Sequence, residues 1–248
     1  MKKLVIGRAF SHPSSDPHPL RRKMRLFSAF FLMTLLFAPL QAEPEKHHGH
    51  PQGHKHNHDF SDAEKWIEKF EDPARDEWQK PDLVVEKLGL KPGMNVADIG
   101  AASGYFTRRM AQQVMPGGYA LAVDIESNFF PYVIERAYSE QQFNLFTVEC
   151  TADDPRLPAD SLDLILIVDT LHHIENRGDY YEKLKASLRE NGRVVVVDFK
   201  KDADIPVGPG PAMRLAADSV QKEFEAAGFT VSVDRETLPY QYILTASI

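Results

Sequence analysis

Acidic side chains lie at or near the ends of apolar stretches, and the first is followed by a turn of small residues. Asp98 precedes the segment Gly100-Ala-Ala-Ser-Gly104, and Asp124 lies 24 residues after Gly100. Glycine lets the backbone approach a ligand because it carries no side chain. A carboxylate placed like Asp124 can accept hydrogen bonds from both hydroxyls of a ribose. The spacing therefore predicts a nucleoside site without identifying the nucleoside.

The stretches that carry these acids alternate with segments of helical pattern. Apolar runs rich in Val, Ile and Leu cover residues 94–100, 119–125, 143–148, 162–169 and 193–199. Such runs are typical of strands buried on both faces of a parallel sheet. Helices are expected at 105–115, 128–139 and 179–190, the last with Tyr181, Leu184 and Leu188 at helical spacing. Parallel strands need crossover helices, so the sequence predicts a doubly wound α/β domain.

The C-terminal part of the chain has a different pattern of apolar residues. We expect a helix that is capped by Asp218 and ends at Gly228. Its core-facing side carries Val220, Phe224 and Ala227. Two strand-like runs follow at 229–238 and 240–248, with Pro239 between them. So short a connection allows only antiparallel pairing, and the sheet should end in a β-hairpin.

The segment from Val96 to Thr107 resembles the first motif of class I S-adenosylmethionine-dependent methyltransferases, an acid followed by Gly-x-Gly-x-Gly. Ala102 takes the place of the middle glycine. The resemblance implies a mostly parallel, seven-stranded, Rossmann-like sheet with S-adenosylmethionine as cofactor. The carboxylate of Asp98 suits the ammonium and sulfonium of that cofactor. The implied cofactor-binding residues are Asp98, Gly100, Ala102, Gly104, Asp124, Ile125, Asp153, Asp154 and Asp169.

Two of these acids belong to the loop Ala152-Asp153-Asp154-Pro-Arg-Leu-Pro158. It resembles the family's loop after the third strand, where an acid accepts a hydrogen bond from the adenine amino group before a Leu-Pro pair. Asp153 fits this register better than Asp154. Either residue could instead be a turn or capping residue.

Two histidines follow the fourth apolar run in the segment Asp169-Thr-Leu-His172-His173-Ile. This resembles the Leu-His-His of the methyltransferase type 11 group, small-molecule enzymes related to those of quinone biosynthesis. Either histidine can be a general base, since neutral imidazole is available near pH 7. The alternative is a histidine packed and hydrogen-bonded beneath the site. The Asn/Asp-Pro-Pro-Tyr motif of amino-group methyltransferases is absent, which disfavours DNA bases and protein amines as acceptors.

Two other functions fit parts of the sequence. A dinucleotide-binding enzyme using NAD needs Gly-x-Gly-x-x-Gly, but Ala102 and Tyr105 stand at its second and third glycines. Asp98 would also repel a pyrophosphate. The other alternative is an exported metal-binding protein whose methyltransferase fold is vestigial.

Residues 59–93 are expected to form an N-terminal helical lid on a sheet core at 94–248. The acidic, tryptophan-containing segment 70–81 resembles one that precedes the domain in a bacterial subgroup of these enzymes, and it implies that Trp78 and Gln79 cover the substrate pocket. An ordinary packing tryptophan is the alternative. The Pro- and Gly-rich loop 202–211 is expected to form the opposite wall.

The charge of the chain is unevenly distributed. Seven of the 29 Lys and Arg residues but only one of the 36 Asp and Glu residues lie in residues 1–25, so the remainder carries a net charge of −13. Such a body repels phosphate backbones, which disfavours a nucleic-acid partner. Cys150, the single cysteine, ends an apolar run and is expected to be a buried structural thiol.

The N-terminal part has the layout of an export signal. Residues 1–42 are interpreted as a signal peptide or N-terminal anchor, because the uncharged stretch 26–42 follows a basic cluster. Residues 43–58 are expected to be a disordered, His-rich linker able to bind Zn²⁺, Ni²⁺ or Cu²⁺ through His47, His48, His50, His54, His56 and His58. We expect a periplasmic or membrane-anchored protein. A cytoplasmic location is the alternative, since S-adenosylmethionine is made in the cytosol.

If 26–42 is a signal peptide, the mature protein begins near Glu43, because the export machinery removes such a segment. N-terminal sequencing of the native protein after cell fractionation checks this. An uncleaved anchor leaves the full chain in the membrane fraction. Full-length protein recovered from the cytosol would contradict both forms of export.

Overall fold

A seven-stranded sheet forms the centre of the computed structural model, which describes residues 62–248. The strand order is β3-β2-β1-β4-β5-β7-β6. The strands are β1 (Val96–Ile99), β2 (Ala120–Asp124), β3 (Leu145–Glu149), β4 (Leu162–Val168), β5 (Leu188–Phe199), β6 (Thr230–Asp234) and β7 (Gln241–Ser247). Strands β1 to β5 pair in parallel, whereas β7 is antiparallel to both β5 and β6. The predicted doubly wound, mostly parallel sheet with an antiparallel C-terminal pair is confirmed.

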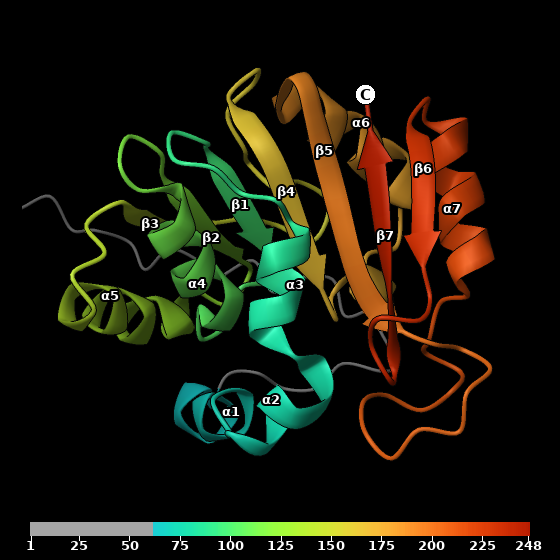
Figure 1. The fold of residues 1–248 in the computed structure, drawn as a ribbon, viewed down its shortest axis with the longest axis horizontal. Coiled ribbons are helices and arrows are strands. Elements are labelled where there is room, and N and C mark those ends of the chain that lie inside the picture. Colours follow the sequence, from blue (N-terminus) through green and yellow to red (C-terminus); the bar gives the residue numbers. More distant parts are fainter. Residues whose placement is uncertain (1–61) are drawn as a thin grey trace, which may run out of the picture. The chain divides into compact units, whose positions relative to one another are not determined.

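Helices cover both faces of this sheet (Figure 1). One face is covered by α3 (Pro81–Lys87), α4 (Tyr105–Val114) and α5 (Phe130–Ser139), and the other by α6 (Arg177–Ser187) and α7 (Ala217–Ala226). Because water reaches neither face, every residue of β1 and β2 is buried. This explains why the central strands read as continuous apolar runs rather than alternating ones.

Two short helices, α1 (Ala63–Phe70) and α2 (Ala74–Gln79), lie beyond the edge at which the parallel strands end (Figure 1). The loop after β5 runs along the same edge. Lys80 joins α2 to α3 and has a φ of 47°. Pro81 is the first residue of α3, where a backbone N–H would have no partner within the helix. The 3-10 helices η1 (Ser127–Phe129) and η2 (Leu171–His173) also belong to this edge.

Two local predictions were wrong. The expected helix 179–190 ends at Ser187, and Leu188 instead begins β5, where it pairs with Leu162. The helical spacing was uninformative here because Leu188 is buried in the observed strand, and a core-facing position of a helix also favours an apolar residue. Asp218 does not cap α7, since the N-cap is Ala216 and the Asp218 carboxylate pairs with Arg235.

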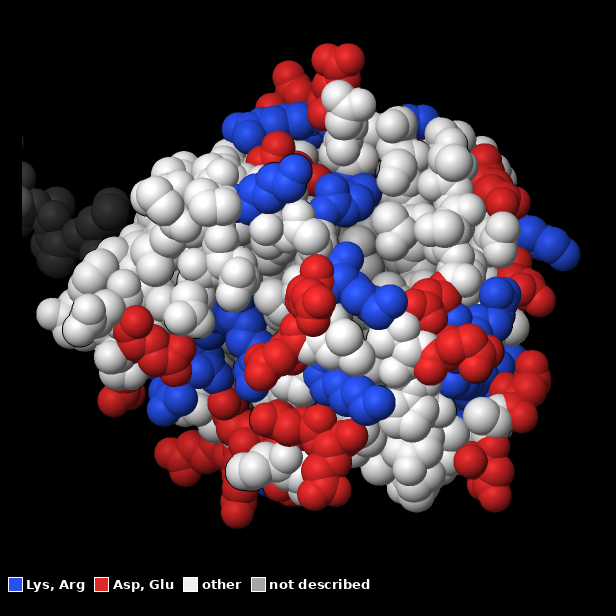
Figure 2. Space-filling view, in the orientation of Figure 1, with Lys and Arg blue, Asp and Glu red and all other residues white. Residues whose placement is uncertain are grey.

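The surface around α1 and α2 is acidic. Figure 2 shows acidic side chains gathered over these helices, where the exposed acids are Asp62, Glu64, Glu68, Asp72, Asp76 and Glu77. Within residues 62–248, no helix combines the length and apolar character needed to cross a membrane. The predicted signal segment and His-rich tract lie outside the described residues.

Candidate functional site

The turn after β1 packs directly against the turn after β4. Gly100 has a φ of 73°, and a Cβ added there would lie 2.1 Å from Oγ1 of Thr170. Glycine is therefore required both by the backbone conformation and by the close approach of the two turns. The turns at the carboxyl ends of β1 and β4 form one continuous surface, as ligand sites in open α/β sheets do.

Ala102, which replaces the middle glycine of the motif, keeps a glycine-like backbone with a φ of 44°. A side chain in this left-handed region costs on the order of 1 kcal/mol or more, and such strain concentrates at functional sites. The N–H of Ala102 donates to Oδ2 of Asp124 at 2.8 Å. This hydrogen bond fixes the turn after β1 to the end of β2.

Asp124 also binds its own loop, because its Oδ1 accepts the N–H of Glu126 at 2.9 Å. The residue is 7% exposed. Burial raises the pKa of Asp124, against the opposing effect of the backbone hydrogen bonds from Glu126 and Ala102. Each carboxylate oxygen has two lone pairs, so Asp124 can accept from a ligand hydroxyl as well as from the backbone. The neighbouring Ile125 is 50% exposed and presents an apolar surface beside these oxygens.

Asp98 lies in β1, beneath the glycine turn. It is 3% exposed, and its Oδ2 accepts the hydroxyl of Thr107 at 2.6 Å. Burial raises the pKa of Asp98 to about 6, with the charge of Asp124 adding to the shift and Thr107 and Arg75 opposing it. A carboxyl in this state is stabilised in its charged form by any cation that binds next to it.

Asp169, at the end of β4, is held by two glutamines. Its Oδ2 accepts from Nε2 of Gln79 at 2.9 Å, and its Oδ1 accepts from Nε2 of Gln241 at 2.5 Å. Burial, with the charge of Asp198 next, raises the pKa of Asp169 to about 7. The backbone of Asp169 is in the left-handed region, with a φ of 53°. Gln79, predicted to belong to a lid, therefore reaches from α2 to the end of β4.

His172 forms a pair with Asp198 of β5. Its Nδ1 lies 3.1 Å from both carboxylate oxygens, and its side chain is 3% exposed. Burial alone would lower the pKa of His172, but the hydrogen bond and charge of Asp198 outweigh it and raise the pKa above its usual 6.5. His173 is exposed, with its ring 4.3 Å from that of His172. His172 is thus held by a carboxylate as a general base would be.

The two acids after β3 make local turn contacts. Asp153 is exposed and accepts from the Thr151 hydroxyl at 2.6 Å, whereas Asp154 accepts the N–H of Arg156 at 2.7 Å. Their loop begins beside the cofactor edge, since the N–H of Cys150 donates to the carbonyl of Asp124 at 2.9 Å. Cys150 is buried as expected, and burial raises the pKa of its thiol to about 12.

Trp78 packs across the ends of two strands. Its ring centroid lies 5.8 Å from that of Phe199 and 6.4 Å from that of Tyr240. Beyond it, near the predicted opposite wall, a hollow of about 290 Å³ is lined by Lys200, Lys201, Asp202, Ala203, Ala216, Ala217, Asp218, Arg235 and Tyr242. Tyr242 is the cross-strand partner of Asp198, so the hollow adjoins β5, the strand whose Asp198 pairs with His172.

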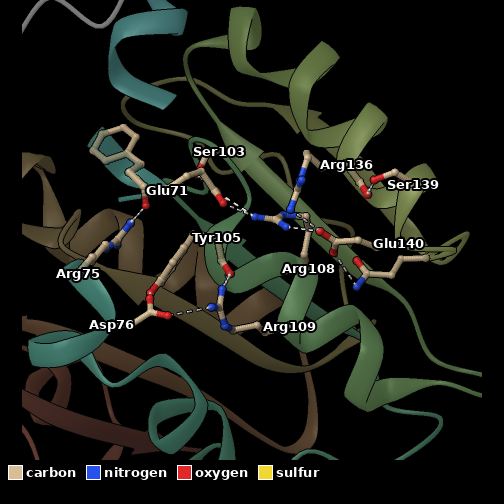
Figure 3. Close-up of polar contacts among 12 residues, drawn as sticks. Glu71, Arg75, Asp76, Ser103, Tyr105, Arg108, Arg109, Arg136, Ser139 and Glu140 are labelled. Atoms are coloured by element: carbon tan, nitrogen blue, oxygen red, sulfur yellow. Dashed lines mark hydrogen bonds and ion pairs between the residues drawn. The ribbon is translucent and has the colours of Figure 1, made fainter. Parts of the chain in front are cut away.

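Several residues that sequence reasoning missed join α1 and α2 to the glycine turn (Figure 3). Glu71 accepts the Ser103 hydroxyl at 2.7 Å and forms two hydrogen bonds with Arg108 at 2.7 and 2.8 Å. Asp76 accepts the hydroxyl of Tyr105. No spacing rule links these partners, which are about thirty residues apart in the chain, so the sequence carries no signal for them.

Within residues 62–248, no group of three or more metal-ligating side chains is placed to hold a metal ion. Metal binding by the His-rich tract remains a prediction about residues outside the described part. The site itself consists of buried carboxyls, one histidine and a strained glycine turn.

Comparison with known proteins identifies a methyltransferase domain in residues 97–194. The ubiquinone/menaquinone biosynthesis C-methyltransferase UbiE of Hahella chejuensis is 23% identical over 176 residues, which are 65% of this chain and 69% of that protein. Phosphoethanolamine N-methyltransferase 1 of Zea mays is 29% identical over 123 residues, and this chain spans only 24% of its length. A crystal structure of an S-adenosylmethionine-dependent methyltransferase from Aquifex aeolicus shares 27% identity and superimposes with a TM-score of 0.69, covering 75% of this chain and 98% of that one.

The chain thus has the Rossmann-like fold of class I methyltransferases, and the comparisons support methyltransferase function with S-adenosylmethionine as the cofactor that the fold implies. The matched region begins at Ala97 and therefore includes the glycine turn, Asp124 and Asp169. Neither the NAD-dependent alternative nor the metal-binding alternative receives support from these relatives.

Asp124→Ala should weaken S-adenosylmethionine binding by at least about tenfold, equivalent to roughly 1.4 kcal/mol, because it removes the ribose acceptor and releases the Ala102 N–H. Isothermal titration calorimetry measures the change. Asp163→Ala is the matched control, since Asp163 accepts the N–H of Asn95 at 2.6 Å at the opposite edge of the sheet. Equal affinity in the wild type and Asp124→Ala would rule out this site assignment.

Proposed function

We propose that this protein transfers the methyl group of S-adenosylmethionine to a small-molecule acceptor, as enzymes similar to the methyltransferase type 11 group do. One observation carries the proposal: the turn after β1 is bound by Asp124 and packed on Thr170, so the ends of β1, β2 and β4 form a single surface. At or directly beneath that surface lie Asp98, Asp124 and Asp169, each a carboxyl that burial makes receptive to a cation or a hydroxyl donor.

The charges at this surface suit S-adenosylmethionine better than a dinucleotide. The cofactor carries an ammonium and a sulfonium, which would lower the raised pKa values of Asp98 and Asp169 on binding. A pyrophosphate would instead meet uncompensated negative charge. We assign the ribose hydroxyls to Asp124, an apolar contact with the nucleoside to Ile125, and the adenine amino group to Asp153.

The pair of His172 and Asp198 supports an acceptor that must lose a proton. Asp198 orients the ring through Nδ1, which leaves Nε2 to take that proton from a hydroxyl or an activated carbon. The similarity to a quinone-biosynthesis C-methyltransferase is consistent with such an acceptor. The acidic surface over α1 and α2 disfavours a nucleic acid.

Bound S-adenosylmethionine supplies an electrophilic methyl group. The chain's own contribution is to hold the acceptor in line with that methyl, and alignment of this kind accounts for much of the rate enhancement in a two-substrate transfer. Trp78 and Gln79 cover the site in this proposal, with the loop 202–211 as the facing wall. We also propose export through 26–42, so the acceptor would be a molecule of the cell envelope.

Incubating the purified protein with methyl-labelled S-adenosylmethionine and cell-envelope extract should produce a labelled small molecule, detected by mass spectrometry. Asp124→Ala is the comparison variant and should yield less product at a cofactor concentration below the wild-type Kd, because it lacks the proposed ribose acceptor. A protein that binds neither the cofactor nor its demethylated product would instead fit the vestigial alternative.

The rate of transfer should rise with pH through the pKa of His172, because only the neutral ring accepts a proton. Asp198 raises that pKa, so Asp198→Asn should move the acid limb of the kcat/KM profile to lower pH. His172→Gln should lower kcat by about a hundredfold or more and remove the limb. His173→Gln is the control at the neighbouring position and should keep the wild-type kcat and the acid limb of the profile. An unchanged profile in His172→Gln would show that this histidine has a packing role.

A further inference from the structure

Arg75 of α2 is a cation at the glycine turn that pairs with no carboxylate in the part of the chain that the structure describes. Its guanidinium carbon lies 4.2 Å from the ring centroid of Tyr105, the first residue of α4. Its Nη1 donates to the carbonyl of Phe70 at 3.0 Å, and its Nε donates to Oε1 of Gln79. Both partners are neutral, so these contacts fix the side chain without neutralising its charge.

Two acids close to Arg75 in the chain also contact the turn and the start of α4, and both are already engaged. Glu71 binds Arg108 and Ser103, and Asp76 binds Tyr105 and lies 3.9 Å from Arg109 (Figure 3). Within residues 62–248, Arg75 forms no ion pair. Burial lowers the pKa of Arg75 in spite of the opposing charges of Asp169, Glu71 and Asp98. A cation in such a place is stabilised by an anion that arrives with a ligand.

The two engaged acids also determine where Arg75 lies. Glu71 and Asp76 flank it in sequence and attach α1 and α2 to the turn and to the start of α4. Arg75 is therefore held beside the turn, and Gln79 links it to Asp169, because Gln79 accepts from Arg75 and donates to the Asp169 carboxyl. The charge of the buried Asp98 also acts on Arg75. One cation opposite two carboxyls is the complement of an α-amino acid, with its carboxylate on Arg75 and its ammonium toward the acids.

We propose that Arg75 binds the α-carboxylate of the methionyl part of S-adenosylmethionine, so that the N-terminal helices complete the cofactor site. This inference rests on the proposed function. It assigns a binding role to a residue outside the matched domain at 97–194. It also makes α1 and α2 part of cofactor recognition, in addition to any cover they provide for the acceptor.

The test compares S-adenosylmethionine with its decarboxylated analogue, which keeps every group except the carboxylate. Wild-type protein should bind the intact cofactor more tightly than the analogue in calorimetry. Arg75→Gln should lose about tenfold or more in affinity for S-adenosylmethionine and bind the analogue as the wild type does. Arg75→Lys should recover part of the preference, because it restores the charge without the planar fork.

Arg109→Gln is the matched control. The guanidinium carbon of Arg109 also lies 4.2 Å from the Tyr105 ring centroid, but Arg109 pairs with Asp76 and Asp82. It should retain the wild-type preference. Equal loss of affinity for both ligands in Arg75→Gln would mean a structural role for Arg75 and would overturn the inference, as would no loss for either. Failure of the wild type to bind S-adenosylmethionine at all would overturn the proposed function, and this inference with it.

Discussion

The hydrogen bond from Ala102 to Asp124 connects the two strands on which the site is built. It joins a strained turn to the end of the neighbouring strand, and its acceptor, Asp124, is buried. A buried carboxylate that accepts backbone N–H groups stays ionised more readily than one without donors, which partly offsets the cost of burying Asp124. The position of the turn over Asp98, and its contact with Thr170, follow from this attachment.

The carboxyl end of the sheet therefore concentrates charges that a folded chain would ordinarily keep in water. Asp98, Asp124 and Asp169 all have raised pKa values, and Asp198 is wholly buried beside His172. Glutamine side chains, a histidine and one arginine compensate only part of this charge. A cationic ligand compensates more of it, so the same burial that raises these pKa values also favours the binding of such a ligand.

Much of this fold could be predicted from the sequence because burial on both faces leaves a plain signal. Each of the seven strands overlaps a predicted apolar run, although β5 begins five residues before its run. The exceptions occur where burial does not decide the conformation, as at Leu188, or where a side-chain contact replaces a cap, as at Asp218. Motif spacing predicted the acids at the strand ends but not Glu71 and Arg75. Their partners are set by how α1 and α2 pack, which no local pattern encodes.

Ala102 has a consequence for the unfolded chain as well as for the site. An alanine there restricts the unfolded turn more than the glycine of the motif would, which lowers the entropy lost on folding by the equivalent of about 0.4–1 kcal/mol. The left-handed backbone costs more than this in the folded state, on the order of 1 kcal/mol or more. The second contribution outweighs the first, so this departure from the motif is destabilising on balance. It also has a steric effect, because a methyl group occupies space at the turn that a glycine would leave open.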